Sequence, residues 1–323
     1  MEKKVYACYL RTKETQLKSS SGGLFTALSD SVLNNNGVVL ACKYNSTNHA
    51  IEYDAAKSKE ARDKLRGSKY IKAEASSLYR VLGETVNKNA KKQIMIVGTP
   101  CQIEGVKKWC DNHSINGNQI ILVDLICHGV SSPNMWKKYI KSVEKRFSSK
   151  VISITFKDKE KGWLRPTAKA VLENGEKILI EDYALLYRSN NIMRDVCYKC
   201  PYSNTDRISD ITIGDYWNYK ALDEDFVDMD GISVAIINSK AGKELFDKSK
   251  QQLKYIESNL EDCLQPNLIE PTKRSCFYKR LNRHYKNRGI EYIIDKYVYY
   301  GPGNKLTRRI RRKIFRIVNK NNN

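Results

Sequence analysis

Short apolar runs alternate with amphipathic segments along the first 150 residues of the chain. After each run, apolar residues recur at helical spacing, as at Leu24, Leu28 and Val32. This alternation predicts a largely parallel sheet flanked by helices. The expected strands are 5–10, 37–44, 93–98 and 119–126. The expected helices are 24–35, 55–65, 71–86, 101–112 and one that starts at Pro133.

The pattern changes after residue 150. Segment 167–180 predicts a hairpin about Asn174-Gly175, a dipeptide typical of tight β-turns. The other expected elements are strands at 151–157, 211–214 and 232–238, a cysteine-rich loop at 197–207 and a helix at 240–255. The fold class is therefore α/β, with a mostly parallel or mixed sheet flanked by helices. We expect three parts: 1–150, 151–260 and a basic helical extension over 261–323.

Composition excludes several classes of protein. With 41% hydrophobic residues, the 323-residue chain can form a core, so disorder throughout is excluded. No run approaches 18 apolar residues, and no membrane-spanning helix is expected. The first residues lack the apolar core of a secretory signal. We therefore expect a cytoplasmic protein whose nine cysteines are reduced thiols, some of them able to hold a metal.

Positive charge is concentrated near the C-terminus. The chain has 57 Lys and Arg against 36 Asp and Glu, a net charge of +21, and residues 271–320 contribute +14. Within 305–320, eight basic residues and no acidic one surround apolar positions at helical spacing, which predicts a basic amphipathic helix. Such a helix either docks on an anionic membrane surface or an acidic partner, or packs on the domain with its basic face in water. No nucleic-acid-binding motif accompanies the charge, so nucleic acid is not the expected partner.

Four cysteines occur where thiolates can share a ligand. Cys197 and Cys200 form a C-x-x-C pair followed by proline, a spacing found in iron–sulfur loops, zinc sites and redox dithiols. Cys101 and Cys127 each follow the carboxyl end of an expected strand, where open α/β sheets bind ligands. Because the two strands are consecutive, we expect them to be neighbours and the four thiols to converge on a 4Fe–4S cluster or zinc. The other cysteines are expected to be small buried residues: Cys8, Cys42, Cys110, Cys263 and Cys276.

Two loops offer backbone donors to an anion. Ser20-Ser21-Gly22-Gly23 precedes a helix, where free amides and the helix dipole favour phosphate, although a plain helix cap is the alternative. Gly67-Ser68-Lys69-Tyr70 is a second flexible loop, and it carries a cation. His128 is a candidate proton donor or a cap. Asp215 and Trp217 follow an expected strand and either contact a planar ring or fill the sheet edge.

Seven segments, taken in order, carry a family resemblance over roughly residues 5–240. They are Ser19-Ser20-Ser21-Gly22-Gly23-Leu24-Phe25, Gly67-Ser68-Lys69-Tyr70, Gly98-Thr99-Pro100-Cys101-Gln102, Asp124-Leu125-Ile126-Cys127-His128-Gly129, residues 156–163 (FKDKEKGW), Cys197-x-x-Cys200-Pro201 and residues 210–217 (DITIGDYW). In this order they resemble the coenzyme F420 hydrogenase/dehydrogenase beta subunit family.

The resemblance implies a flavoprotein that holds FAD and a 4Fe–4S cluster and passes electrons between them and a hydride-carrying substrate. Residues 1–150 would then be the FAD-binding part, and 151–260 would carry the cluster loop. By the same resemblance, the cluster ligands are Cys101, Cys127, Cys197 and Cys200. The FAD-phosphate loops are Ser20-Ser21-Gly22-Gly23 and Gly67-Ser68-Lys69-Tyr70. The residues expected near the flavin ring or the cluster are Thr99, Pro100, His128 and Gly129.

Two departures from the family pattern shape the expected function. Many relatives begin with a ferredoxin-like module rich in cysteine, whereas this chain has only Cys8 in its first 41 residues. Electrons would then come from a separate ferredoxin-like carrier or partner subunit. The basic extension also lies outside the resemblance. The leading interpretation is an iron–sulfur flavoprotein oxidoreductase acting on coenzyme F420 or another small organic hydride carrier. The alternative is a non-catalytic adaptor, stabilised by zinc or a cluster, that docks through its basic tail.

Overall fold

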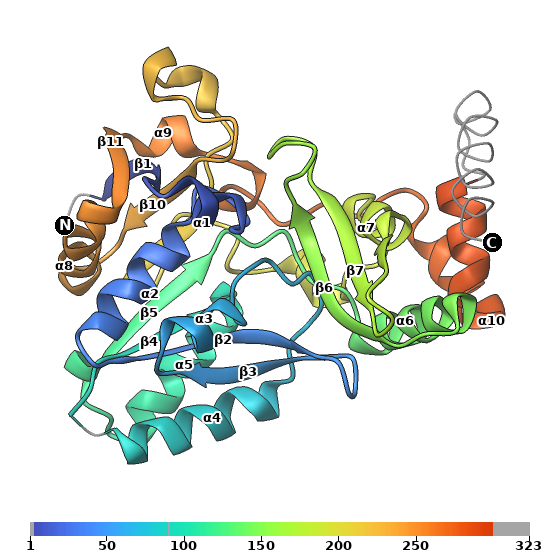
Figure 1. Ribbon diagram of the computed structural model, residues 1–323, viewed down its shortest axis with the longest axis horizontal. Helices are drawn as coiled ribbons and strands as arrows, with labels where there is room; N and C mark the ends of the chain where they lie inside the picture. Colours follow the sequence, from blue (N-terminus) through green and yellow to red (C-terminus); the bar gives the residue numbers. More distant parts are fainter. Residues whose placement is uncertain (1–2, 90, 300–323) are drawn as a thin grey trace.

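The computed structural model describes residues 3–89 and 91–299. Its main feature is an eight-stranded sheet in the order β11-β1-β10-β9-β5-β4-β2-β3 (Figure 1). Strands β2, β4, β5 and β9 run parallel, and antiparallel pairs complete the sheet at both ends. The strands are β1 (Lys4–Leu10), β2 (Val38–Asn45), β3 (Ala50–Ala56), β4 (Ile94–Gly98), β5 (Ile120–Leu125), β9 (Ile211–Asp215), β10 (Ser233–Ile237) and β11 (Leu253–Ser258).

Helices cover both faces of this sheet because its central strands are apolar on both sides. One face packs against α2 (Leu24–Asn34) and α8 (Lys240–Ser249), which contact each other. The short helix α3 (Lys59–Asp63) lies beside them. The opposite face packs against α4 (Ala75–Lys88) and α5 (Pro100–Asn112). Two further short helices are α1 (Lys13–Leu17) and α9 (Leu260–Cys263).

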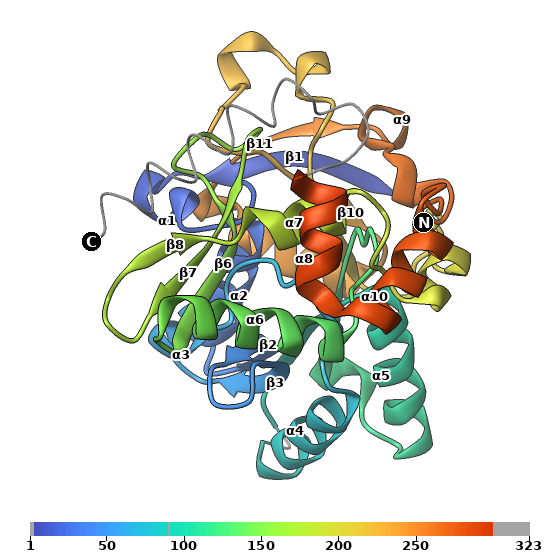
Figure 2. The ribbon, with the colours of Figure 1, turned by 90° about the vertical axis from the view of Figure 1, so that its right-hand side faces the viewer.

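A second layer stands beside the large sheet. Its three-stranded antiparallel sheet contains β6 (Val151–Asp158), β7 (Thr167–Leu172) and β8 (Lys177–Leu179). Three helices pack in this layer: α6 (Pro133–Phe147), α7 (Glu181–Arg188) and α10 (Tyr278–Ile293), which continues into the π-helical turn Ile294–Tyr299. The apolar core of this layer is continuous with the α4–α5 side of the large sheet. Helix α10 and helix α8 lie at opposite ends of the molecule (Figure 1). Figure 2 looks onto the end that carries α6 and α10.

The expected fold class is confirmed: a mixed sheet with a parallel centre, flanked by helices. Strands β4 and β5 are parallel neighbours, as their order in the chain predicts. Strands from both sides of residue 150 share the large sheet, and the division into three parts stays a prediction.

Two expected helices are partly wrong. The helix expected over 55–65 is shortened to α3, because its first residues belong to edge strand β3, whose Ile51 and Tyr53 face the core. The helix expected over 240–255 ends at Ser249, and β11 follows because Leu253 pairs with Leu10 of β1. Helix α7 was not expected. The helix expected over 305–320 lies outside the described residues. No helix in the described ranges is both long and apolar enough to cross a membrane.

Candidate functional site

A cavity of about 940 Å³ lies where the large sheet meets the second layer. Its walls come from the carboxyl ends of β4, β5 and β9, from the loop before α2, from the loop after α3 and from the cysteine loop. A cavity at the carboxyl ends of parallel strands is where open α/β sheets bind ligands. Fifteen of the sixteen residues expected at the site line it: Ser20, Ser21, Gly23, Gly67, Ser68, Lys69, Tyr70, Thr99, Pro100, Cys101, Cys127, His128, Gly129, Cys197 and Cys200. Their roles in binding or catalysis stay predictions.

Four cysteines from three separate segments lie in this cavity wall. Cys101 is in the first turn of α5, Cys127 follows β5, and Cys197 and Cys200 lie at the short turn Asp195–Lys199. The thiols are near enough to interact: burial raises the pKa of the Cys127 thiol to about 12, the Gly129 amide opposes this shift, and the other three thiols add to it. The Thr99 hydroxyl lies 3.2 Å from the Cys101 sulfur. Three segments that are distant in sequence therefore meet at one cluster of thiols.

The four thiols do not form a site for one metal ion in this structure. Among the described residues, no group of three or more His, Cys, Asp or Glu side chains could hold one metal ion. In a 4Fe–4S cluster each thiolate binds a different iron, so its four ligands surround a larger object than a zinc ion does. None of the nine cysteines, all in the described part of the chain, forms a disulfide. The expectation that the other five are buried is wrong for Cys276, which is exposed, and Cys42 is half-buried and lines the cavity.

Gly129 lets the cysteine loop approach the segment that follows β5. Its φ of 125° is a conformation that residues with a side chain rarely adopt. A Cβ atom there would lie 2.4 Å from the Met193 sulfur and 3.2 Å from Cβ of Cys197. The absence of a side chain at this position thus leaves room for Met193 and Cys197 to pack against the segment that follows Cys127.

A buried ion pair holds the other end of the cysteine loop. Arg207 donates to the Asp124 carboxylate on β5 at 3.2 Å, and each side chain is 2% exposed. Burial raises the pKa of Asp124, and the guanidinium of Arg207 opposes that shift. Because removing either partner would leave a buried charge uncompensated, this pair fixes the loop to the sheet.

The two expected anion-binding loops are adjacent. The amide of Ser68 donates to the Ser20 hydroxyl at 2.8 Å, and the Ser68 hydroxyl lies 3.1 Å from the same oxygen. Helix α2 begins after Gly23 and has no side-chain cap, so amides of its first turn are not satisfied by a capping side chain. Gly22 does not line the cavity. Its Cα packs on the backbone of β1 and β10, where a Cβ atom would lie 2.4 Å from the Cys8 carbonyl oxygen.

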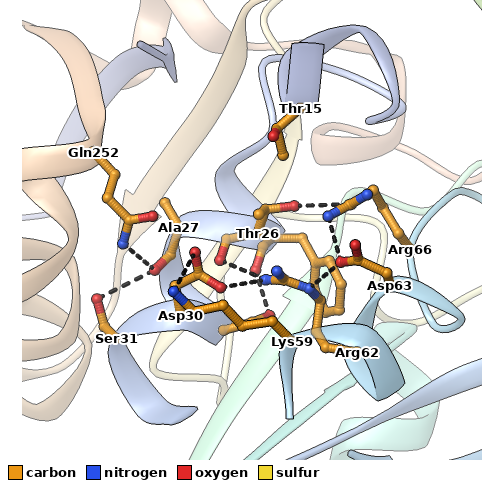
Figure 3. Close-up of polar contacts among 12 residues, drawn as sticks. Thr15, Thr26, Ala27, Asp30, Ser31, Lys59, Arg62, Asp63, Arg66 and Gln252 are labelled. Atoms are coloured by element: carbon orange, nitrogen blue, oxygen red, sulfur yellow. Dashed lines mark hydrogen bonds and ion pairs between the residues drawn. The ribbon is translucent and has the colours of Figure 1, made fainter. Parts of the chain in front are cut away.

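An ion-pair network fixes the second loop to α2 (Figure 3). Arg62 is 3% exposed, pairs with Asp30 at 2.8 Å and donates to the Thr26 carbonyl at 2.9 Å. Arg66, which lines the cavity, donates to the Thr26 hydroxyl at 3.1 Å and pairs with Asp63. The loop that follows Arg66 is therefore held against the first turns of α2, beside the Ser20-Ser21-Gly22-Gly23 loop.

Lys159 is a positioning residue that the sequence pattern did not single out. Its ammonium group donates to three backbone carbonyls, those of Gln16 (2.8 Å), Ser21 (2.6 Å) and Asp230 (2.6 Å). Burial lowers its pKa to about 8. By binding the Ser21 carbonyl, Lys159 ties the loop before α2 to the second layer. The only sequence signal for it was its place in the 156–163 segment of the family resemblance.

The cavity wall is rich in cations. Lys69 donates to the carbonyls of Leu65 (2.6 Å) and Arg66 (2.9 Å), and burial lowers its pKa to about 8. Four other lining cations form no ion pair with a carboxylate of the described residues: Lys72, Lys161, Arg165 and Arg194. The lining carboxylates Glu181 and Asp215 are paired with Arg188 and Lys157. Lys72 is half-buried and the other three are exposed at the cavity margin, and unpaired positive charge around a cavity favours an anionic ligand.

His128 lines the cavity, but its ring is held by protein groups. Its Nε2 lies 2.8 Å from Oδ1 of Asn190, and its Nδ1 lies 3.3 Å from Oδ1 of Asn267. The Thr272 hydroxyl donates to its backbone carbonyl at 2.7 Å. With both ring nitrogens facing neighbouring side chains, this arrangement suits a residue that orders the wall; the catalytic role expected for His128 stays a prediction.

An aromatic pair completes the wall on the β9 side. Trp217 is 45% exposed and lines the cavity, and its ring stacks on the fully buried Trp163, with centroids 5.2 Å apart and planes 1° from parallel. Asp215 accepts hydrogen bonds from Trp163 (2.8 Å) and Lys157 (2.6 Å). The cavity therefore combines thiols, a helix start without a side-chain cap, cations and an aromatic surface.

Comparisons with known proteins agree with this architecture. The family model for the C-terminal part of the coenzyme F420 hydrogenase/dehydrogenase beta subunit matches residues 91–262. A chain of the F420-reducing nickel–iron hydrogenase complex from Methanosarcina barkeri has a similar fold, with a TM-score of 0.53 and 16% sequence identity over 79% of this chain and 83% of that chain. No curated protein matches the chain. The family match spans more than half of the chain and includes all four converging cysteines. The chain therefore belongs to the coenzyme F420 hydrogenase/dehydrogenase beta subunit family.

Proposed function

We propose that this chain is an iron–sulfur flavoprotein subunit of an oxidoreductase. The observation that carries the proposal is that four thiols and the two loops expected to bind an anion line one cavity. A 4Fe–4S cluster would supply single-electron transfer and FAD would supply hydride transfer when bound. The substrate side of the reaction would be a small organic hydride carrier such as coenzyme F420.

The thiol cluster fits an iron–sulfur centre. Cys101, Cys127, Cys197 and Cys200 would hold it, because all four line one cavity and the other three thiols interact with that of Cys127. Backbone amides of Gly129 and Val130 interact with Cys127 and Cys197, and amide donors stabilise thiolates over thiols. The buried Asp124–Arg207 pair would keep the Cys200 side of the loop in place during redox change.

The remaining wall fits a dinucleotide. The first turn of α2, which has no side-chain cap, would donate to its phosphates, as amides at helix starts do. The Gly67-Ser68-Lys69-Tyr70 loop would contribute donors other than the Ser68 amide, which is bonded to the Ser20 hydroxyl. Lys69 and the unpaired cations would balance its charge, and Trp217 offers a flat apolar surface for a ring. Lys159 would keep the Ser21 loop in the orientation that presents its amides to the cavity.

Anaerobic purification tests the proposal directly. We expect about four iron and four sulfide per chain, as a 4Fe–4S cluster requires, and a flavin absorbance that survives desalting after reconstitution with excess FAD. Serine at each of the four converging cysteines should lower the iron content. Cys263→Ser is the matched control, because Cys263 is buried in the core formed with β1 and β10 and lies outside the cavity.

The outcomes separate this function from its alternative. Zinc at one per chain without iron, in protein prepared without oxygen, would support a zinc-stabilised adaptor and reject the iron–sulfur assignment. Absence of flavin after reconstitution would reject the FAD assignment even if iron were present.

A further inference from the structure

We propose that the first turns of α10 and the adjacent cysteine loop form a docking surface for an acidic one-electron carrier protein of the ferredoxin class. The α10 surface comprises Lys199, Lys273, Arg274, Phe277, Lys279, Arg280, Arg283 and Lys286, together with Arg194 and Val196. This proposal rests on the proposed function, because electrons can be delivered at the α10 surface only if the four thiols hold an iron–sulfur centre. The step is a one-electron exchange: in the delivering direction the carrier is oxidised and the centre beside Cys197 is reduced.

The α10 surface is physically joined to the cysteine loop. Arg274 pairs with Asp195 at 2.6 Å, two residues before Cys197. The ring of Tyr278 packs edge-on against Tyr198, with centroids 5.1 Å apart, and the guanidinium of Arg274 lies 5.0 Å and 4.7 Å from the ring centroids of Tyr198 and Tyr278. A protein bound to the start of α10 would therefore lie against the residue next to Cys197. Electron transfer between proteins needs this kind of proximity between docking surface and redox centre.

The α10 surface carries more positive charge than its carboxylates neutralise. Six exposed cations form no ion pair with any carboxylate in the described ranges: Arg194, Lys199, Lys279, Arg280, Arg283 and Lys286. The carboxylates in the same region, Asp195 and Glu270, are paired with Arg274 and Lys273. Lys279, Arg283 and Lys286 are spaced to share one stripe of the helix, opposite the buried Leu281. Such a surface attracts an acidic partner and accelerates its encounter.

Two exposed apolar side chains lie within this basic area. Val196 is 62% exposed at the cavity margin, and Phe277 is 37% exposed at the start of α10. Apolar and aromatic residues surrounded by charged ones are typical of protein interfaces, where the apolar part is desolvated and the charged rim directs approach. A bilayer would need an apolar helix face that is open to lipid, whereas the apolar residues Leu281, Ile290 and Ile293 of α10 are buried in the protein core.

A charge-reversal pair tests the docking surface. Lys279→Glu/Arg283→Glu changes the α10 stripe, and Lys240→Glu/Lys248→Glu is the matched control on α8, at the opposite end of the molecule (Figure 1). Both variants alter net charge equally and replace exposed side chains, so folding is expected to be preserved. The probe is a reduced bacterial ferredoxin of known acidic charge, mixed anaerobically with cluster-loaded, FAD-loaded protein in a stopped-flow instrument.

We expect reduction by the ferredoxin to slow by about tenfold or more at low ionic strength in the α10 variant, and by less than about twofold in the α8 control. Salt should slow the wild type and have little effect on the α10 variant, because screening removes the same attraction. Reduction by dithionite, which needs no docking protein, should be equal in all three proteins.

Each result has a definite meaning. Equal ferredoxin rates in the two variants would overturn the docking surface while leaving the iron–sulfur function intact. Failure of dithionite to reduce any centre in the wild type would reject the proposed function itself. Sedimentation of the wild type, but not the α10 variant, with phosphatidylglycerol vesicles, together with unchanged ferredoxin rates, would assign the surface to a membrane and refute an electron-carrier partner.

Discussion

Replacing Arg207 by leucine should unfold the protein more easily because it strands a buried carboxylate. Arg207 and Asp124 are each 2% exposed and 3.2 Å apart, so neither charge is solvated by water. Removing one partner of a buried ion pair lowers the free energy of unfolding by about 3–5 kcal/mol. Asp124 Oδ1 and Arg207 Nη2 have no hydrogen-bond partner, so the pair is incompletely satisfied and the loss should be near the lower limit, about 3 kcal/mol.

The double variant Asp124→Asn/Arg207→Leu provides the critical comparison. Because it removes the stranded charge together with its partner, it should regain most of the lost stability and lie within about 1 kcal/mol of the wild type. The exposed pair Arg80–Glu84 offers a matched control, since Arg80→Leu should change stability by less than about 0.5 kcal/mol.

The effect of pH gives an independent check. Burial already raises the pKa of Asp124, and loss of Arg207 would raise it further. A carboxyl whose pKa is higher in the folded than in the unfolded state costs stability when ionised, and this cost declines as pH falls through the folded-state pKa. The deficit of Arg207→Leu should therefore be smaller at about pH 5 than at about pH 7.

Urea unfolding of the metal-free protein, followed by circular dichroism at both pH values, measures these free energies. A loss below about 1 kcal/mol in Arg207→Leu, or a double variant no more stable than the single one, would refute the view that this pair anchors the cysteine loop.

Three further predictions concern the cavity. FAD affinity should fall as pH rises through about 8, because Lys69, whose pKa is lowered to about 8 by burial, loses its charge. Equilibrium titration should show that FAD affinity depends less on pH in Lys69→Met. An unchanged dependence would exclude Lys69 from anion binding. Gly129→Ala should lower the free energy of unfolding by about 2 kcal/mol and the iron content by about half or more, because its Cβ would collide with Met193. A normal iron content by colorimetric assay would contradict this. Lys159→Met should lower the free energy of unfolding by about 2–4 kcal/mol in urea, because it leaves three backbone carbonyls unpaired. Substitution of the exposed Lys161 by Met should leave it nearly unchanged. Equal stability of the two variants would argue against a positioning role for Lys159.

The parallel centre of the fold was predictable from sequence alone. Strands buried on both faces need continuous apolar runs, and segments 93–98 and 119–126 show such runs followed by amphipathic helices. The carboxyl ends of these strands also placed Cys101 and Cys127 correctly, because neighbouring parallel strands end at the same edge. The sequence pattern was enough to predict these strands because burial in the sheet requires the same apolar residues that make the pattern.

The edge strands and the anchors of the site depended on tertiary structure. Segments 50–56 and 253–258 are short and amphipathic, so their apolar spacing fits a helix or a strand until pairing with β2 and β1 decides between them. Arg207 and Asp124 are 83 positions apart, and Lys159 and Ser21 are 138 positions apart. A lone arginine or lysine in a sequence is typical of a solvated surface. Only the folded chain surrounds Arg207 and Lys159 with buried oxygen atoms. Because these charges are buried, each holds its oxygen partners in place and so fixes the segments that line the cavity.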